Sequence, residues 1–227
     1  PWLFYIGDVG VPSYWVMVLT GLVAAAYLGY RLAVARGIDG QRLLDLDLIL
    51  VIVGVAGARL MHVLVEENPL DPSQPILYHY IEHPAEIFDI SNGLAFYGAV
   101  LLCLPVAAWY LRRKQMPLAA SLDIYALCVP VGLFFGRLGC FLAGCCHGPP
   151  TDLPWGVIYS DPESLARPLG TPLHPVQLYS AAFALLLFGV LWLARSRAGD
   201  FPGRSALLLG VLYPAGRFLL EFVRGDI

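Results

Sequence analysis

Charged side chains are scarce in this chain of 227 residues. They make up 14% of the sequence, whereas hydrophobic residues make up 58%. A soluble domain typically carries about 25% charged residues. The net charge of −3 and the lack of any lysine- and arginine-rich run exclude a basic surface for nucleic acid. With a mean hydropathy of +0.68, the composition instead predicts an integral membrane protein.

The sequence also lacks internal repeats, low-complexity segments and a basic leader. The lack of repeats excludes solenoid and array architectures. The opening PWLFYIGDVG has no positively charged start, so we expect no cleavable signal peptide. A single helical bundle would use the whole chain, and we therefore expect one transmembrane domain over residues 1–227.

Long apolar segments are what the chain has in abundance. Six of them are long enough to cross a bilayer as helices. They run over Tyr14–Tyr30, Leu46–Val65, Gly93–Leu111, Leu122–Leu142, Pro175–Leu193 and Ala206–Val223. The sequence therefore predicts an all-α integral membrane bundle of six to seven helices with loops at its outer face.

The charges of the connecting loops predict the orientation of these helices. Three alternate loops carry most of the basic residues: Arg31, Arg36 and Arg42, then Arg112, Arg113 and Lys114, then Arg195, Arg197 and Arg204. Basic loops stay in the cytoplasm. The other two loops, about residues 66–92 and 143–174, hold most of the acids. We expect these two loops and both termini at the outer face.

Three arginines lie inside the apolar segments, namely Arg59, Arg137 and Arg217. An arginine at bilayer depth costs at least ~2.5–3.5 kcal/mol on insertion scales, so it needs an anionic partner or a wet cavity. Glu221 lies one helical turn after Arg217, but Arg59 and Arg137 have no acidic neighbour of this kind. The guanidinium fork binds phosphate in a bidentate way. We therefore predict a pocket for an anionic lipid headgroup, the alternative being arginines that cap helices or snorkel to the interface.

Three segments of the chain should meet near the outer face: SNGLAFYG, GRLGCFLAGCCHG and LHPVQLYS. Gly98, Gly136 and Gly139 flank the predicted site, and the last two bracket Arg137 and would leave room for a ligand. The alternative for such glycines is close helix packing. A site in this place would open to the outer leaflet and the outer compartment.

Six elements of the sequence, in order, resemble those of one family. They are GARLMHVL, EIFDISNGLAFYGAVL, GRLGCFLAGCCHG, PWGVIY, HPVQLYS and YPAGRFLLEFVR. In this order they resemble the phosphatidylglycerol:prolipoprotein diacylglyceryl transferases of bacterial inner membranes. The family is generally drawn with seven spans, so a seventh could precede Pro1 or lie in re-entrant pieces near Leu77–Ile90.

The resemblance implies a reaction and its site residues. The family transfers the diacylglyceryl group of phosphatidylglycerol to the thiol of a lipobox cysteine in a secreted preprolipoprotein, and glycerol phosphate leaves. Arg137 then corresponds to the signature arginine and Arg217 to the late-helix arginine. Tyr97, where family members have His or Tyr, would donate a hydrogen bond or simply pack. The further residues implied or placed nearby are His174, Gln177 and Tyr179 at the outer end of the cavity, and Glu221 with Arg224.

The chain departs from the family signature at the loop after Arg137. Cys140 and Ala143 stand where the resemblance expects Asn, and Cys145 stands where it expects Glu; Cys146 and His147 follow. A carboxylate could act as a base, so we predict that His147 faces the cavity and takes over part of this role. The alternative is a loop residue in a divergent outer cap.

The cysteines themselves have four interpretations. The leading one is packing as small apolar side chains. The others are a Cys140–Cys145 disulfide, a metal site and a nucleophile beside His147. We expect no metal and no cofactor. Cys103 and Cys128 lie mid-helix and should be core residues.

These observations favour a diacylglyceryl transferase in the bacterial inner membrane, multi-pass and monomeric, with its site facing the periplasm. Two alternatives remain open. One is a homologue that uses the same phospholipid donor and a different acceptor. The other is a lipid-binding or lipid-transport protein without catalytic activity. Release of glycerol phosphate from phosphatidylglycerol distinguishes the enzyme from the binder.

Overall fold

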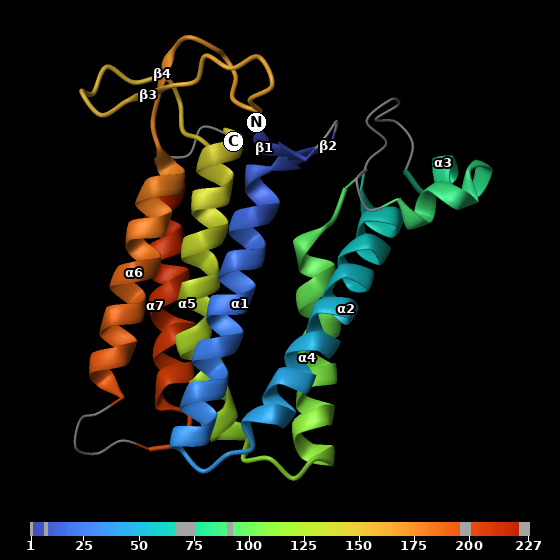
Figure 1. Ribbon diagram of the computed structural model, residues 1–227, viewed down its shortest axis with the longest axis vertical. Helices are drawn as coiled ribbons and strands as arrows, with labels where there is room; N and C mark the ends of the chain where they lie inside the picture. The colour runs from blue at the N-terminus through green and yellow to red at the C-terminus, as the bar shows by residue number, and fades with distance from the viewer. Residues whose placement is uncertain (1, 7–8, 67–75, 90–92, 196–200, 223–227) are drawn as a thin grey trace. The chain divides into compact units, whose positions relative to one another are not determined.

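The computed structural model describes residues 2–6, 9–66, 76–89, 93–195 and 201–222, and most of them are helical (Figure 1). The chain divides into two compact units. The first unit comprises residues 1–37 and 119–227, and the second comprises residues 38–118. That both units form one transmembrane domain stays a prediction.

Six long helices correspond to the six predicted spans. They are α1 (Ser13–Ala35), α2 (Gly40–Val65), α4 (Phe96–Arg113), α5 (Leu118–Ala143), α6 (Val176–Ala194) and α7 (Arg204–Glu221). The predicted end of the last span, Val223, lies outside the described residues. The helical prediction is therefore confirmed for every segment, with boundaries that shift by a few residues.

Length and composition qualify four of these helices to cross a membrane, namely α1, α2, α5 and α6. Both α4 and α7 are 18 residues long. Arg112 and Arg113 end the first of them, and Arg204, Arg217 and Glu221 lie in the second, so their hydropathy is lower. That α4 and α7 also cross the membrane stays a prediction.

The second unit is built on the packing of α2 against α4. Asp39 caps α2, because its carboxylate accepts hydrogen bonds from the backbone N–H groups of Gln41 and Arg42 at 3.0 and 3.2 Å. Gly57 and Gly98 bring the two helices into backbone contact: a Cβ on Gly98 would lie 2.1 Å from the carbonyl oxygen of Gly57. Small residues allow such close approach between membrane helices.

Two short helices lie between α2 and α4, α3 (Ile76–Glu82) and the 3₁₀ helix η1 (Pro84–Phe88). The seven residues of α3 would reach about 10 Å at 1.5 Å per residue, whereas a bilayer core is about 30 Å thick. The described part of the segment near Leu77–Ile90 therefore does not supply a seventh span, because neither piece is long enough.

The first unit begins with an antiparallel hairpin of β1 (Trp2–Ile6) and β2 (Val9–Pro12), which leads directly into α1. Helix α1 packs on α5 through glycines. A Cβ on Gly139 would lie 3.2 Å from atoms of Tyr14 and Met17, and one on Gly29 would lie 3.3 Å from the Cys128 sulfur. The hairpin and the close packing hold the start of α1 beside the end of α5.

The two remaining helices of this unit, α6 and α7, also pack together. A Cβ on Gly216 would clash with the Phe183 ring, so only glycine fits there. The buried Asp123 of α5 accepts hydrogen bonds from the backbone of Gly203 and Ala206 at 2.7 and 3.0 Å. Its negative charge at the start of α7 also complements the helix dipole. Asp123 therefore fixes the start of α7 against α5.

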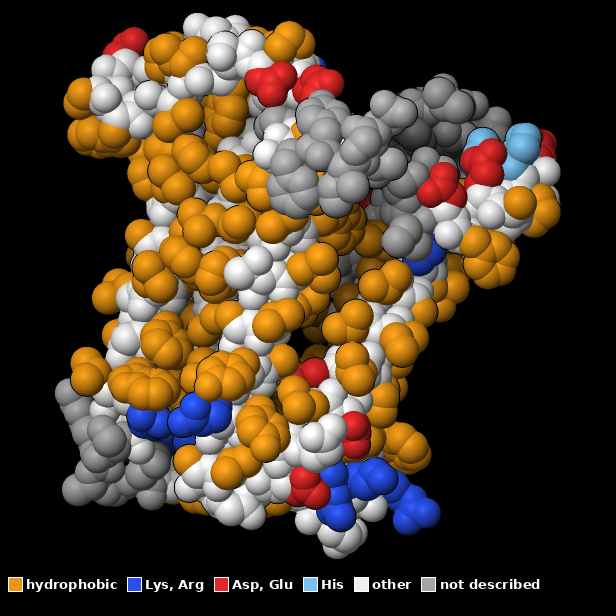
Figure 2. Space-filling model, viewed as in Figure 1, with side chains coloured by type: hydrophobic (Ala, Val, Ile, Leu, Met, Phe, Trp, Pro, Cys, Tyr) orange, Lys and Arg blue, Asp and Glu red, His pale blue; other side chains and the backbone are white. Residues whose placement is uncertain are grey.

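Large apolar side chains are exposed along the long helices of both units. Val23 is 69% exposed, Leu48 67%, Leu101 67%, Leu186 64% and Val211 68%. Figure 2 shows hydrophobic side chains over the visible helical surfaces, with lysine and arginine confined to small groups. Such continuous apolar surface is far larger than a soluble monomer exposes. The helices therefore belong in lipid, and the chain is a membrane protein.

Candidate functional site

Arg137 and Arg217 meet in one pocket of the first unit. The pocket lies between α5, α6 and α7 and has a volume of about 20 Å³; its walls are Leu133, Arg137, Ser180, Phe183, Ala184, Tyr213, Arg217 and Leu220. Arg217 forms an ion pair with Glu221. Arg137 forms no hydrogen bond or ion pair with any residue that the structure describes. As it stands this space is large enough for about one water molecule, so a phosphate would enter only after the surrounding side chains move. It would then meet one guanidinium without a partner among the described residues and a second one oriented by a carboxylate.

The surroundings of Arg137 differ on its two sides. A Cβ on Gly136 would meet no atom within 4 Å, so space is open there, whereas Gly139 packs against α1. Arg137 is close enough to Tyr14 and Cys140 to interact with both electrostatically. Of the two glycines that bracket Arg137, Gly139 serves helix packing. That a ligand occupies the open space at Gly136 stays a prediction.

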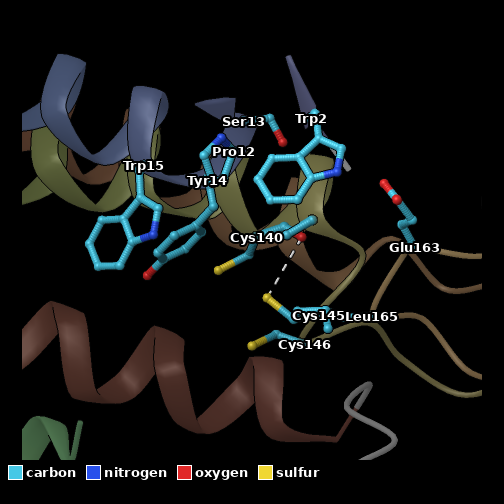
Figure 3. A pocket seen from close by; sticks show the side chains of 11 residues that line it. Trp2, Pro12, Ser13, Tyr14, Trp15, Cys140, Cys145, Cys146, Glu163 and Leu165 are labelled. Carbon is cyan, nitrogen blue, oxygen red and sulfur yellow. Dashed lines mark hydrogen bonds between the residues drawn. The ribbon is translucent and has the colours of Figure 1, made fainter. Parts of the chain in front are cut away.

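A much larger cavity, of about 600 Å³, lies where α1 starts and α5 ends. Figure 3 shows the side chains that line it: Trp2, Pro12, Ser13, Tyr14, Trp15, Cys140, Ala143, Cys145, Cys146, Glu163 and Leu165. The walls are mostly apolar, and their polar groups include the Ser13 hydroxyl, the Tyr14 phenol, three thiols and the exposed Glu163 carboxylate. A cavity of this kind suits an apolar substrate with a small polar group.

Three thiols gather on one wall of this cavity. The sulfurs of Cys140, Cys145 and Cys146 all lie within 4.8 Å of one another. None of the three is in a disulfide, and the Cys145 sulfur lies 3.8 Å from the Cys140 carbonyl oxygen. Hydrogen bonds with the neighbouring thiols, together with burial, raise the pKa of the Cys145 thiol above its usual range. Both effects favour the protonated form of the Cys145 thiol.

A hydrogen-bonded frame holds the loop that carries these cysteines. The buried Gln177 donates a hydrogen bond from Nε2 to the Cys145 carbonyl at 2.7 Å. Leu165 N donates to the carbonyl of Ala143 at 2.9 Å. Tyr159 donates to the Phe141 carbonyl at 3.1 Å, and burial raises its pKa to about 12. Gln177 was expected at the outer end of the cavity, and the structure gives it a positioning role behind the cavity wall.

His174 and Tyr179 lie in a short relay at the start of α6. Trp155 donates a hydrogen bond from Nε1 to the Tyr179 hydroxyl at 2.7 Å, and that hydroxyl lies 3.3 Å from Nδ1 of His174. Neither residue lines the cavity of Figure 3.

His147 was predicted to face the cavity, and the structure places it elsewhere. Its Nδ1 lies 2.8 Å from the Gly148 carbonyl, and its Nε2 lies 3.3 Å from the backbone N–H of Arg167. His147 is absent from the walls of the large cavity. Both ring nitrogens are engaged by the loop backbone, and this arrangement favours the loop residue over the general base.

Arg59 lies in the second unit, where its guanidinium is saturated by the protein. It donates hydrogen bonds to the carbonyl oxygens of Ile87, Gly93 and Glu86 at 2.8, 3.1 and 2.6 Å, and to the Tyr80 hydroxyl at 3.0 Å. Its side chain is 5% exposed. Arg59 therefore fastens the segment between α2 and α4, and these contacts leave little of its guanidinium for a phosphate.

The other predicted residues of the second unit are Tyr97 and Gly98. Tyr97 is 76% exposed in the first turn of α4, and Gly98 packs against Gly57. The contacts of Gly98 favour helix packing over ligand binding. Arg224 lies outside the described residues.

The cavity residues that sequence reasoning missed include Trp2, Tyr14 and Glu163. Trp2 comes from the hairpin and Glu163 from the long segment between α5 and α6, where no periodic pattern reveals direction. Tyr14 stands at the predicted start of the first span, where it was not singled out as a site residue. The structure shows that Tyr14 itself is beside Cys140 (Figure 3).

Comparisons with known proteins identify the family of this chain. The family model described as prolipoprotein diacylglyceryl transferase matches residues 1–227. The phosphatidylglycerol–prolipoprotein diacylglyceryl transferase of Clostridium tetani is 33% identical over 100% of this chain and 86% of its own length. That of Symbiobacterium thermophilum is 33% identical over 100% of this chain and 81% of its own length. The phosphatidylglycerol–prolipoprotein diacylglyceryl transferase 2 of Clostridium perfringens is 32% identical over 94% of this chain and 79% of its own length. The chain therefore belongs to the prolipoprotein diacylglyceryl transferase family.

Proposed function

We propose that this protein transfers the diacylglyceryl group of phosphatidylglycerol to the thiol of a lipobox cysteine in a preprolipoprotein and releases glycerol phosphate. The names of its relatives supply the donor and the class of acceptor. The observation that carries the proposal is the pairing of Arg137 and Arg217 in one pocket, with the donors of Arg137 unused by described residues. Such a pair binds a phosphate whose charge increases during the reaction.

The bonds that change explain why two arginines are needed. The acceptor sulfur forms a bond to the terminal glyceryl carbon, and the bond from that carbon to the phosphate oxygen breaks. The phosphodiester leaves as a phosphate monoester with one more negative charge, and the thiol proton is released. Arg137 and Arg217 stabilise this added charge through charge-assisted hydrogen bonds, which favours the transition state over the bound lipid.

Glu221 has a positioning role in this scheme. Its ion pair with Arg217 holds one guanidinium at the pocket, so less rotamer entropy is lost when the phosphate binds. Because Arg137 has no such partner among the described residues, it can follow the phosphate as the charge moves. Tyr97 as a hydrogen-bond donor to the lipid stays a proposal.

The pocket of Arg137 and Arg217 and the large cavity are both lined by residues of α5. The pocket uses Leu133 and Arg137, and the cavity uses Cys140 and Ala143, one to two helical turns further along. Arg137 can therefore hold the headgroup while the acceptor thiol enters beside Tyr14 and the cysteines. This neighbourhood supports transfer between a lipid and a peptide in one site.

The proposed location is the bacterial inner membrane, with the site at the periplasmic side and the chain as a monomer. The basic residues of the first unit support this orientation. Arg36 and Arg204 lie near the end of α1 and the start of α7, and the cavity lies near the start of α1. Basic loops remain cytoplasmic, and this supports a cavity at the opposite, periplasmic face.

A lipid assay of the purified full-length protein tests the proposed function. Phosphatidylglycerol labelled in its headgroup is supplied in detergent micelles with a lipobox peptide, and glycerol phosphate release is measured. The proposal predicts release that requires the peptide cysteine and is lost in Arg137→Gln, while the control Arg31→Gln keeps full activity. Release without dependence on the peptide cysteine would point to a different acceptor, and bound lipid without any turnover would show a lipid binder or transporter.

A further inference from the structure

The cluster of Cys140, Cys145 and Cys146 is the feature of this chain that the transfer reaction as described above does not use. Two of these cysteines stand where the family resemblance expects an amide and a carboxylate. Their sulfurs gather within 4.8 Å of one another on the wall of the large cavity. Three convergent thiols are more than core packing requires, and as thiolates they are ligands that soft metal ions prefer.

We propose that Cys140, Cys145 and Cys146 bind one soft d¹⁰ metal ion, with Zn²⁺ as the reference ion, and that its fourth coordination position opens into the cavity. Three sulfurs that share one Zn²⁺ at about 2.3 Å lie roughly 3.8 Å apart. The thiols already lie within 4.8 Å of one another, so small side-chain rotations complete the site. Three protein ligands with an open position are the arrangement of catalytic zinc sites.

The backbone around the cluster is held in a conformation that brings the thiols together. Cys146 has φ +60°, a left-handed conformation that is uncommon for a residue with a side chain. It is maintained from both sides, because Gln177 donates to the Cys145 carbonyl and Gly144, at φ +81°, packs against Ser164. Backbone strain that the surroundings maintain is typical of functional sites.

The charges near the cluster also suit a metal–thiolate centre. Three thiolates and one divalent cation carry a net charge of −1. Arg137 is close enough to Cys140 to interact electrostatically, and it offsets this charge. The three thiols are partly buried, which limits the exchange of a bound metal ion with bulk water. Figure 3 shows the Cys145 sulfur directed to the Cys140 carbonyl, with the Cys146 sulfur beside it.

The open position would hold the thiol of the acceptor peptide, and this step rests on the proposed function. A thiol that coordinates a metal loses its proton, which passes to solvent. The metal-bound thiolate then forms its bond to the glyceryl carbon, the carbon–oxygen bond breaks, and glycerol phosphate leaves with that electron pair. The metal centre would thereby replace the carboxylate that the family resemblance expects at Cys145.

Metal binding is measured on the full-length protein, purified under reducing conditions and stripped of metal. Co²⁺ is the probe, because its thiolate charge-transfer and d–d bands report sulfur ligands and tetrahedral geometry, and Zn²⁺ then competes for the site. We expect one Co²⁺ per chain and loss of the charge-transfer band in Cys140→Ser, Cys145→Ser and Cys146→Ser. Cys103→Ser is the matched control, because its thiol lies in α4 of the second unit, 3.4 Å from the Leu50 carbonyl.

Several results would overturn the metal site. They are wild-type protein that gives no thiolate band, single serine variants that bind Co²⁺ as well as the control, and a disulfide among these cysteines in protein that still turns over. Helix content by circular dichroism identifies variants that fail to fold. If a variant fails to fold, a second measurement on wild-type protein takes its place: Zn²⁺ should protect the thiols from an alkylating reagent. Thiols that react equally fast with and without Zn²⁺ would refute the site.

The open position is tested by adding the lipobox peptide to the Co²⁺-loaded protein. The proposal predicts a shift of the d–d bands with the cysteine peptide and none with its serine version; unchanged bands with both peptides would refute this part. Turnover that persists at full rate in metal-free protein would refute the catalytic role and leave the proposed function intact. Metal binding without turnover on any acceptor would instead refute the proposed function and leave the metal site intact.

Discussion

Replacement of Arg137 is the most direct perturbation of the proposed phosphate pocket. Arg137 has no hydrogen bond or ion pair with the residues that the structure describes. The variants Arg137→Gln and Arg137→Lys therefore leave no protein group without its partner. The free energy of unfolding should change by less than about 0.5 kcal/mol, as for a substitution away from stabilising contacts. A loss of activity in these variants would therefore not be explained by a loss of stability.

The expected loss of activity follows from the two bonds of a bidentate guanidinium–phosphate pair. Charged hydrogen bonds contribute about 1.5–3 kcal/mol each, so two of them contribute roughly 3–6 kcal/mol. At 1.36 kcal/mol per tenfold change in rate, Arg137→Gln should lower kcat/KM by about 10²- to 10⁴-fold. Arg137→Lys keeps the charge without the fork and should also lose most of the activity.

The assay is the initial rate of glycerol phosphate release over a range of phosphatidylglycerol concentrations, at equal amounts of folded protein. Arg217→Gln is the informative comparison, because it also breaks the ion pair with Glu221 and should lower stability as well as rate. Wild-type kcat/KM in either Arg137 variant would remove Arg137 from the site and refute the reasoning.

Three further predictions test the packing and the loop. Gly98→Leu should separate α2 from α4 and cost about 1–3 kcal/mol, because a Cβ there already lies 2.1 Å from the Gly57 carbonyl oxygen; Gly136→Ala, with open space around it, is the control, and thermal unfolding of both decides. His147→Ala should lower stability and leave most of the turnover, since its ring binds loop backbone; a loss of about 10²-fold or more would restore it as a general base. Burial raises the pKa of Tyr159 to about 12, so the folded state favours the neutral phenol. Its contribution to stability is therefore full below pH ~10 and declines as the pH rises toward 12. Tyr159→Phe should reduce this alkaline loss of stability, and an unchanged profile of unfolding free energy against pH would refute the reasoning.

The sequence predicted the helices well, because long apolar runs leave few alternatives in a membrane. It predicted the association of Arg137 with Arg217 only through the order of the family motifs, since 80 residues separate them. The function of Arg59 was harder to predict. Its partners are mostly backbone carbonyls of the segment before α4, and a search for acidic neighbours cannot detect carbonyl acceptors.

The residues that line the large cavity could not be predicted from the periodicity of apolar residues either. The hairpin that brings Trp2 to the cavity is short, and the segment that carries Glu163 has little regular structure. The close approach of Gly57 and Gly98 was visible only as two glycines in separate helices. Convergence of the three thiols depends on the positive φ of Cys146, which no residue pattern indicates for a cysteine.

The central claim is that this protein joins a diacylglyceryl group to a cysteine thiol while Arg137 and Arg217 hold the leaving phosphate. Mass spectrometry of a lipobox peptide, incubated with phosphatidylglycerol and the purified protein, tests it most directly. The account predicts a diacylglyceryl thioether on the peptide cysteine in amounts equal to the glycerol phosphate released, and about 10²- to 10⁴-fold slower formation of both products with Arg137→Gln. Unmodified peptide beside intact, protein-bound phosphatidylglycerol would contradict it.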